Sequence, residues 1–463
     1  MYKPHPIKHK FRLWIILILF TGLSGCGEVE ERFQQLRSLL PESSPVAEPQ
    51  GLEPSPPPLS PSDYRTFTDW CLNKDNLIEE TQQTVEILLQ KAGVTDCLLA
   101  ADELSSQTQL DLSGAELKDI TPLVTLPNLT RLDLSNNQIN SLIPLSGLTQ
   151  LNELNVSDNL VEDITPLVSL TNLTVLILHD NQIRAIESLT NLINLNQLSL
   201  DNNQVNQINP LANLDNLTIL SLSDNQTRDL TPLANLVNLT KLNISRNDIN
   251  DLTILSNLPN LTHLELRENK ITDLTPLSDL SNLTQLSLDG NQINNLSSLS
   301  NLTTLTKLQL SDNQIAEIKP LSSLINLQVL NLRSNQISDI KPIAELINLT
   351  DDLNLINNQI SDIKPLSELN KLTLLGLEKN KISDIEPISN LENLTVLYLG
   401  DNQITDVEPL AELTLLTELN LWNNQIENIE SLSALENLSY LGLQDNPIEN
   451  KICPIEPDSV CQF

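Results

Sequence analysis

From about Leu110 onward the sequence repeats itself every 22 residues, and this period constrains the fold more than any other feature. One unit reads Leu-Thr-Arg-Leu-Asp-Leu-Ser-Asn-Asn-Gln-Ile over residues 129–139, and a connector with Pro144-Leu145 follows it. A marker Asn recurs in fifteen units, with one extra residue before Asn358, and a sixteenth unit has Ala115 in the marker place. The marker positions are Asn137, Asn159, Asn181, Asn203, Asn225, Asn247, Asn269, Asn291, Asn313, Asn335, Asn358, Asn380, Asn402, Asn424 and Asn446.

Each unit combines the pattern of a short strand with that of a turn. Leu-x-Leu alternates in and out as in a half-buried strand, and so short a unit buries almost nothing until neighbours stack on it. The marker Asn offers donors and an acceptor to the backbone groups of a buried turn. Pro occurs in most connectors, where no strand donor is needed. The pattern therefore predicts stacked units that share one sheet and one aliphatic core.

The 22-residue units resemble leucine-rich repeats. Connectors of the form Ile-x-Asp-Ile-x-Pro-Leu, such as residues 360–366, are most similar to those of bacterial internalins, and the resemblance covers about 340 of the 463 residues. It implies an α/β solenoid: a curved rod with a parallel β-sheet on its concave side, short turns or 3-10 helices on its convex side and a helical N-terminal cap. We expect about sixteen repeats in residues 106–446.

The N-terminus has the three parts of a bacterial lipoprotein export signal. A basic segment precedes the apolar run of residues 13–20, which is too short for a transmembrane helix because that needs about 20 residues. Residues 23–26, Leu-Ser-Gly-Cys, resemble a lipobox. The resemblance implies that residues 1–25 are a signal peptide, that Cys26 carries the lipid, and, since Gly27 follows, that the outer membrane is weakly favoured. An ordinary cleaved signal with a chance Cys is the alternative.

Residues 26–62 are expected to be a spacer. Eight prolines lie between Pro41 and Pro61, and a chain so rich in Pro prefers extended conformations and builds no core. The spacer would hold the folded part away from the membrane, although a Pro-motif ligand for a partner is an alternative. The formal net charge of −34 argues against nucleic acid as a partner, since a phosphate backbone requires a Lys/Arg surface.

Both ends of the repeat array need a cap, because terminal units expose core. In residues 63–105, apolar side chains recur at helical spacing from Ile78 to Ala92, Gly93 follows as a stop signal, and a second short helix is predicted over residues 96–104. Residues 447–463 are expected to form the C-terminal cap.

Two cysteines lie in each predicted cap: Cys71 and Cys97 flank the N-terminal helix, and Cys453 and Cys461 bracket the C-terminal tail. Export permits disulfides, and four Cys allow three pairings. The two ends of a long solenoid lie far apart, which favours local pairs. A metal site is the rival interpretation, but neither pair has Cys-x-x-Cys spacing and no His is nearby.

Aromatic side chains identify the candidate binding surface. Only three lie between Ala115 and Asn446, all at outward concave positions of consecutive repeats. Clustered, exposed Trp and Tyr are typical of binding hot spots; packing against one another or shielding the C-terminal cap is the alternative. The three aromatics and their apolar and acidic neighbours, which we call the aromatic patch, are Tyr398, Trp422, Tyr440, Ile356, Leu374, Val396, Glu378, Asp401 and Glu418.

Two further features concern the concave face. The one-residue insertion at Asp351-Asp352 precedes the aromatic patch, and we expect it to bulge the sheet there. A smaller apolar spot, formed by Val175, Ile177 and Ile219, is weaker evidence for a binding surface.

Little in the sequence points to an enzyme. His179 and His263, the only histidines after Cys26, face the concave surface without a nucleophile motif, a metal motif or a Gly-rich phosphate loop. We therefore predict no catalytic residue, no metal site and no cofactor, and leave loose Ca²⁺ binding open. Asn-Leu-Thr triplets match a glycosylation sequon, but they recur at one phase of the repeat and are assigned to its architecture.

Together these features predict a monomeric, lipid-anchored extracytoplasmic protein that contacts the membrane only through its lipid and binds a protein partner with its concave face. By resemblance, internalins grip host receptors with that face, but no sorting motif or further domain follows the repeats here, so adhesion or envelope assembly fits as well. A structural envelope spacer without a specific ligand is the alternative. Phosphatase regulation in the cytoplasm, known for related repeats, conflicts with the export signal.

Overall fold

The computed structural model of the protein describes residue 60 and residues 63–463, so the predicted signal peptide, Cys26 and the predicted spacer up to residue 59 lie outside the described residues. Residues 60–463 form one compact unit. In the described part of the chain, seventeen strands form one parallel sheet in which each strand pairs with the next along the chain. They are β1 (Gln109–Asp111), β2 (Arg131–Asp133), β3 (Glu153–Asn155), β4 (Val175–Ile177), β5 (Gln197–Ser199), β6 (Ile219–Ser221), β7 (Lys241–Asn243), β8 (His263–Glu265), β9 (Gln285–Ser287), β10 (Lys307–Gln309), β11 (Val329–Asn331), β12 (Asp352–Asn354), β13 (Leu374–Gly376), β14 (Val396–Tyr398), β15 (Glu418–Asn420), β16 (Tyr440–Gly442) and β17 (Cys461–Gln462).

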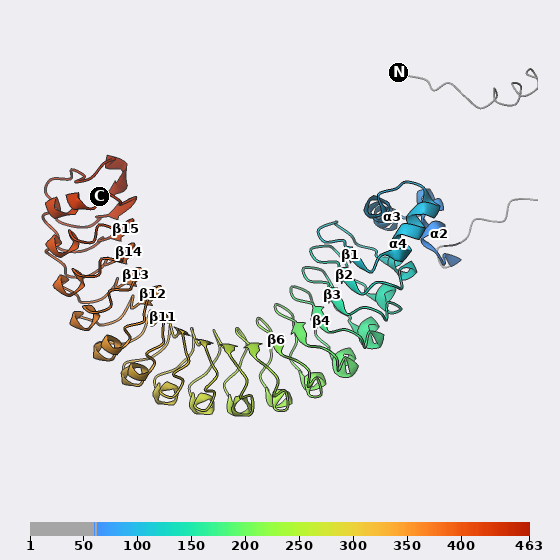
Figure 1. The fold of residues 1–463 in the computed structure, drawn as a ribbon, viewed down its shortest axis with the longest axis horizontal. Helices are drawn as coiled ribbons and strands as arrows, with labels where there is room; N and C mark the ends of the chain where they lie inside the picture. Colours follow the sequence, from blue (N-terminus) through green and yellow to red (C-terminus); the bar gives the residue numbers. More distant parts are fainter. Residues whose placement is uncertain (1–59, 61–62) are drawn as a thin grey trace, which may run out of the picture. The chain divides into compact units, whose positions relative to one another are not determined.

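The sheet lines the inner side of an arc, and short 3-10 helices lie on the outer side (Figure 1). Three α-helices cover the N-terminal end of the arc: α2 (Phe67–Leu72), α3 (Glu79–Ala92) and α4 (Cys97–Ser106). This confirms the predicted curved solenoid with a parallel concave sheet and a helical cap. The 3-10 helices are η2 (Lys74–Asn76), η3 (Thr121–Thr125), η4 (Ile143–Leu145), η5 (Thr165–Ser169), η6 (Glu187–Asn191), η7 (Asn209–Leu211), η8 (Thr231–Leu233), η9 (Thr253–Asn257), η10 (Thr275–Leu277), η11 (Ser297–Leu299), η12 (Lys319–Ser323), η13 (Lys341–Glu345), η14 (Lys364–Leu366), η15 (Glu386–Ile388), η16 (Glu408–Leu410), η17 (Glu430–Ala434) and η18 (Asp458–Val460).

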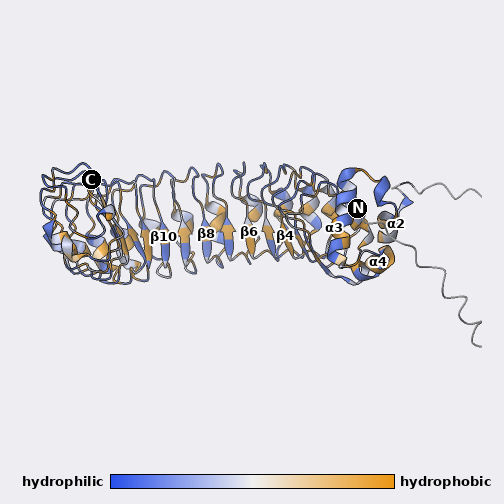
Figure 2. Ribbon diagram, turned by 90° about the horizontal axis from the view of Figure 1, so that it is seen from above, coloured by the Kyte–Doolittle hydropathy of each residue, from blue (hydrophilic) through white to orange (hydrophobic). Residues whose placement is uncertain are grey.

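The core of the repeats is aliphatic throughout. From Leu110 to Leu443 the buried hydrophobic side chains are Leu, Ile and Val, most of them completely inaccessible. Burial of one such side chain stabilises the fold by roughly 1.5–3 kcal/mol, so the stacked units share a continuous core that no single unit supplies. Figure 2 shows the hydrophobic residues recurring from strand to strand along the solenoid.

The marker Asn side chains hold each turn and join neighbouring repeats. In the buried Asn291, the amide nitrogen donates to the carbonyl oxygens of Leu266 (3.0 Å), Leu288 (3.0 Å) and Asp289 (3.3 Å). Its Oδ1 accepts from the backbone amide of Ile271 at 3.0 Å. Since the same bonds recur from Asn137 to Asn446, the predicted role of the marker Asn is confirmed.

Two further ladders follow the same period. Aspartates in the connectors accept a backbone hydrogen bond from the residue two positions later, as Asp273 does from Thr275 at 2.9 Å, and this turn begins the 3-10 helix. The Asn of the Asn-Leu-Thr triplets donates to a carbonyl of the preceding repeat, as Asn282 does to Pro259 at 2.9 Å. The triplets are therefore part of the repeat architecture.

The N-terminal cap docks on the first repeat through α3. This helix ends at Gly93 in the left-handed conformation (φ 69°), as its sequence predicts. Thr81 and Thr84 of α3 donate side-chain hydrogen bonds to Asp119, and Gln83 donates to the Ala115 carbonyl oxygen at 3.0 Å. A disulfide joins Cys71 in α2 to Cys97 at the start of α4.

The C-terminal segment covers the last repeat by extending the sheet. Strand β17 pairs with β16, and the segment buries its own Ile448, Ile455 and Val460. A second disulfide joins Cys453 to Cys461. Both predicted local cysteine pairs are present. Among the described residues, no helix has the length and apolar character needed to cross a membrane.

The insertion at Asp351-Asp352 leaves the strands in register. Leu353 of β12 pairs with Leu330 of β11 on one side and with Leu375 of β13 on the other. The extra residue lies just before β12. The amides of Thr373 and Leu374 contact two carbonyl oxygens there, of Thr350 (3.0 Å) and Asp351 (3.2 Å), whereas the corresponding two amides of the other repeats share one carbonyl oxygen. The predicted bulge is thus confined to the edge of the sheet and does not re-aim the strand residues.

Candidate functional site

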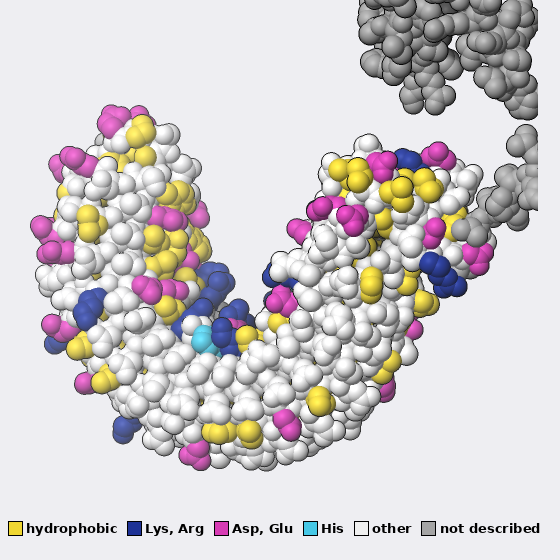
Figure 3. Space-filling model, turned by 45° about the vertical axis from the view of Figure 1, so that its right-hand side comes forward, with side chains coloured by type: hydrophobic (Ala, Val, Ile, Leu, Met, Phe, Trp, Pro, Cys, Tyr) yellow, Lys and Arg dark blue, Asp and Glu magenta, His cyan; other side chains and the backbone are white. Residues whose placement is uncertain are grey.

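Three outward sheet positions recur in every repeat: the two strand residues that flank the central Leu, and the residue two positions after the strand. Tyr398 ends β14, Tyr440 begins β16, and Trp422 lies two residues after β15. All three aromatic side chains are half-buried, so each retains surface for a ligand. Figure 3 shows apolar side chains gathered with acidic ones on the inner side of the C-terminal arm.

Trp422 lies across the preceding repeat. A Cβ atom built on Gly400 would be 2.1 Å from the indole Nε1, so the ring occupies the space that a side chain at Gly400 would fill. The indole Nε1 donates to Oε1 of Glu378 at 3.3 Å, and the Asn420 amide donates to the same oxygen at 2.8 Å. Trp422, Asn420 and Glu378 therefore form one hydrogen-bonded group.

Tyr398 links the aromatic rings to a second carboxylate. Its hydroxyl is hydrogen-bonded to Glu418 in the neighbouring strand. Burial raises the pKa of Tyr398 to about 12, and the hydrogen bond to Glu418 and the charges of Glu418 and Glu378 contribute. Tyr398 is therefore a neutral phenol that donates to Glu418 at physiological pH.

Glycines make room for the other large side chains of the patch. A Cβ atom on Gly376 would lie 3.0 Å from Cδ1 of Ile356, and one on Gly442 would lie 3.0 Å from the hydroxyl of Tyr440. Leu374 and Val396 are direct neighbours across β13 and β14, and both are half-buried. An apolar floor thus adjoins the aromatic rings.

Asp401 is the member of the patch that the structure places at its margin. It has a left-handed backbone (φ 55°) in the turn beside the marker Asn. Its Oδ1 accepts a hydrogen bond from the Asn423 amide at 2.7 Å, which links two adjacent turns. Asp401 therefore borders the sheet positions instead of lying among them.

Three residues near the predicted site were not assigned to it from the sequence. Asn420 orients Glu378, and Gly400 provides the space that Trp422 fills. Asp352 is half-buried, its Oδ1 is fully buried without a hydrogen-bond partner, and burial raises its pKa, with Asp351 adding to the effect. The useful signal was Gly400 at an outward sheet position, since Gly in a sheet often marks a place where another group approaches closely.

Basic residues lie on the same face toward the middle of the arc. The outward sheet positions of β7 to β11 include Lys241, Arg267, Lys307 and Arg333. Arg267 is paired with Glu265 (3.2 Å) and Asp289 (3.4 Å). In Figure 3 a group of Lys and Arg side chains with a His lies beside the apolar region of the C-terminal arm.

The two histidines have different surroundings. Nδ1 of His179 lies 2.7 Å from Oδ2 of Asp180 and 3.9 Å from Oδ2 of Asp158, in the neighbouring repeat. These three groups are close enough to share a metal ion, and the same distances make an ion pair with protonated His179. His263 is half-buried between repeats, and burial lowers its pKa.

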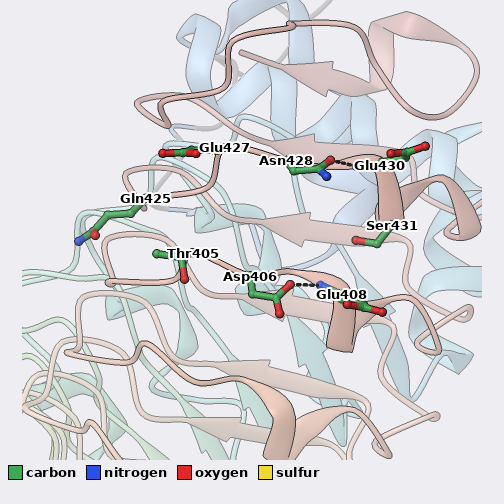
Figure 4. Close-up of a pocket in the computed structure, with 8 residues that line it drawn as sticks. All are labelled: Thr405, Asp406, Glu408, Gln425, Glu427, Asn428, Glu430 and Ser431. Carbon is green, nitrogen blue, oxygen red and sulfur yellow. Dashed lines mark hydrogen bonds between the residues drawn. The ribbon is translucent and has the colours of Figure 1, made fainter.

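A separate depression lies between the connectors of the last repeats (Figure 4). Asp406 accepts from the Glu408 amide and Asn428 from the Glu430 amide, both at 2.9 Å, as in the other connectors. Glu427 also lines the depression. The depression is built from the repeating turn, so it adds acidic surface but no distinct chemistry.

Comparison with known protein families agrees with the geometry. A family model for leucine-rich repeats in two copies matches residues 127–169, 171–213, 303–348 and 370–412. A second leucine-rich repeat model matches residues 237–293, 259–315 and 392–448. No curated protein sequence matches the chain.

Several solved structures are similar. An internalin of Listeria monocytogenes, InlF, is 33% identical with a TM-score of 0.63, over 74% of this chain and 95% of that one. A leucine-rich repeat protein of Leptospira interrogans is 31% identical with a TM-score of 0.70, over 76% and 93%. The Arabidopsis receptor kinase HAESA, solved with the peptide hormone IDA, shares the fold at 21% identity and a TM-score of 0.54, over 73% and 70%.

Proposed function

The chain belongs to the leucine-rich repeat family with internalin-like repeats, and from this premise we propose that it is a monomeric, lipid-anchored, extracytoplasmic module that binds a protein partner through the aromatic patch. Adhesion or an interaction within the cell envelope is the function that this arrangement supports best. The patch lies in β12 to β16 and the turns beside them.

One observation carries this proposal. Tyr398, Trp422 and Tyr440 occupy three consecutive repeats of an otherwise non-aromatic sheet, and each remains half-exposed although hydrogen bonds hold Trp422 and Tyr398 in place. Aromatic side chains that are both ordered and accessible lose little conformational entropy on binding and are enriched at interface hot spots.

The relatives support the same interpretation. Leucine-rich repeat proteins commonly act as interaction modules without enzymatic activity, and the similar structures include internalins and a receptor with a bound peptide hormone. In the described structure, His179 is hydrogen-bonded to the Asp180 carboxylate and His263 to the Thr262 hydroxyl. Of these two partners only the Thr262 hydroxyl is a potential nucleophile. A binding role therefore accounts for more of the site than a catalytic one.

The extracytoplasmic location is supported by the two disulfides and by the internalin relatives. Disulfides persist in oxidising compartments. The proposed anchor is Cys26, within the lipobox-like Leu-Ser-Gly-Cys of residues 23–26. Expression with a radiolabelled fatty acid should label the wild-type protein but not a Cys26→Ser variant, which should also leave the membrane fraction; equal labelling of both would contradict lipid anchoring.

The binding proposal is tested by chemical cross-linking to envelope extract. The wild-type chain is compared with Tyr398→Ala/Trp422→Ala/Tyr440→Ala and with Ile177→Ala/Ile219→Ala, which removes apolar side chains from outward positions of β4 and β6. We expect one cross-linked partner with the wild type and the control, and its loss with the aromatic variant. If the wild type and both variants recover the same partner, the aromatic patch is not the binding site. If none of the three proteins recovers a partner, the structural spacer is favoured.

A further inference from the structure

The concave face is divided by charge. In β12 to β16 the outward sheet positions hold Asp352, Glu378 and Glu418 but no Lys or Arg. The same positions in β7 to β11 hold four Lys or Arg and only two carboxylates. The aromatic patch is therefore the acidic part of this surface, next to a basic part (Figure 3).

The carboxylates of the patch lack cationic partners. Elsewhere on the rod, acidic side chains do form ion pairs, as Glu153 does with Arg131 at 3.1 Å. Among the described residues, none of Glu378, Asp401 and Glu418 forms such a pair. Asp401 accepts from the Asn423 amide. The groups that donate to Glu378 are the neutral indole of Trp422 and the amide of Asn420. The neutral hydroxyl of Tyr398 donates to Glu418. Their negative charge is thus oriented by hydrogen bonds but not neutralised.

The surroundings of these carboxylates suit a cation. Aromatic faces attract an ammonium or guanidinium group within about 6 Å of the ring centroid, and Tyr398 and Trp422 are each hydrogen-bonded to one of the two glutamates. The raised pKa of Tyr398 reflects, after burial, the hydrogen bond to Glu418 and then the charges of Glu418 and Glu378. The negative potential of the patch therefore acts on its aromatic rings.

We infer that the aromatic patch accepts a cationic side chain, arginine in preference to lysine, presented by an apolar segment of the protein partner. This rests on the proposed function and specifies the partner's chemistry. The guanidinium is planar, stacks on aromatic rings and donates to two carboxylates at once, whereas an ammonium is a compact and strongly hydrated charge. The apolar neighbours of the arginine would contact Leu374 and Val396, which are half-buried beside the rings.

The direct test uses short synthetic peptides as probes. The full-length protein in detergent is titrated with acetyl-Leu-Arg-Leu-amide, with the lysine peptide, and with a citrulline peptide that keeps the shape of arginine but carries no charge. Binding is followed by calorimetry and by the fluorescence of Trp422, with Trp422→Phe identifying its signal. We expect the arginine peptide to bind roughly tenfold more tightly than the citrulline peptide, with an advantage that falls as salt is added. Equal affinity for these two peptides would overturn the inference.

Amide variants separate the charge from the packing. In Glu378→Gln/Glu418→Gln the side-chain oxygens still accept from Trp422, Asn420 and Tyr398, but both charges are gone. Glu153→Gln/Glu265→Gln makes the same change at outward positions of β3 and β8. We expect the patch variant to lose the preference for arginine and the control to keep it. A patch variant that retains the preference would overturn the inference.

The inference and the proposed function can fail separately. If the envelope partner is lost with the aromatic triple variant but retained at full affinity with Glu378→Gln/Glu418→Gln, protein binding stands and recognition of a cation is wrong. If no envelope partner is found, the function fails, while the peptide titration still decides whether the patch accepts a cation.

Discussion

The indole nitrogen of Trp422 donates a hydrogen bond to Oε1 of Glu378, two repeats away along the concave sheet, at 3.3 Å. Alternate strands of a parallel sheet are nearly 10 Å apart, so the contact requires two long side chains and an empty position between them. Gly400 provides that position. The order of the aromatic patch therefore depends on a residue without a side chain.

A methyl group at Gly400 should displace Trp422. Gly400→Ala would place Cβ 2.1 Å from the indole Nε1 and 2.3 Å from Cδ1, far inside contact distance. We expect the ring to leave Glu378, the Trp422 fluorescence to shift towards that of exposed indole, and the free energy of unfolding to fall by about 1–3 kcal/mol, as overpacking does. Fluorescence spectra and urea unfolding measure both effects.

The matched control for this change is Gly147→Ala. Nothing lies within 4 Å of a Cβ atom at Gly147, in a connector on the outer side of the arc. Its fluorescence should equal that of the wild type. An unchanged Trp422 signal in Gly400→Ala would show that the indole does not occupy the space over Gly400.

The marker asparagines should contribute far more to stability than the exposed ones. Asn291→Ala removes three donated bonds and one accepted bond. The Ile271 amide loses its partner, whereas the three carbonyl oxygens keep the side chains of Asn269 and Asn313 and the Glu268 amide as donors. We expect the free energy of unfolding to fall by about 3 kcal/mol. Asn282→Ala, which removes one exposed bond to Pro259, should cost less than about 1 kcal/mol. Equal midpoints of urea unfolding for the two variants would contradict this assignment.

Most of the fold follows from the period. Leu at the strand centres, Asn at the turns and Asp in the connectors each satisfy the same local requirement in every repeat, so one unit predicts the others. The cap helix α2 was missed because six residues are too few for a periodic signal. A local signal did exist, since Thr66 and Asp69 form a capping box at its start.

The candidate site was less predictable. Alternation along a strand indicates which side chains face outward, and it placed Tyr398, Trp422 and Tyr440 on the concave face. It does not indicate how far a side chain reaches across neighbouring strands. The contact between Trp422 and Glu378, 44 residues apart, depends on the rotamers of both side chains and on Gly400 between them, and no single repeat contains this information.

The two disulfides should stabilise the chain unequally. Cys71–Cys97 spans 26 residues and joins α2 to α4, whereas Cys453–Cys461 spans only 8. In the chain-entropy model the longer loop contributes about 3.5 kcal/mol and the shorter about 2.5 kcal/mol. Cys71→Ser/Cys97→Ser should therefore lower the thermal midpoint more than Cys453→Ser/Cys461→Ser does. The reverse order would show that the C-terminal cap limits stability.

Tyr398 should make the protein sensitive to alkali. Its pKa in the folded state, about 12, exceeds the ordinary value, so the folded state holds this proton more tightly than the unfolded state does. The resulting stability is complete below about pH 10 and is lost as the pH rises towards 12. Tyr398→Phe should remove this part of the alkaline loss.

Glu418→Gln should lower the pKa of Tyr398 by removing a nearby charge, and absorbance titration of the phenolate measures the shift. A pKa of Tyr398 that stays near 12 in Glu418→Gln would show that the charge of Glu418 does not contribute to the shift.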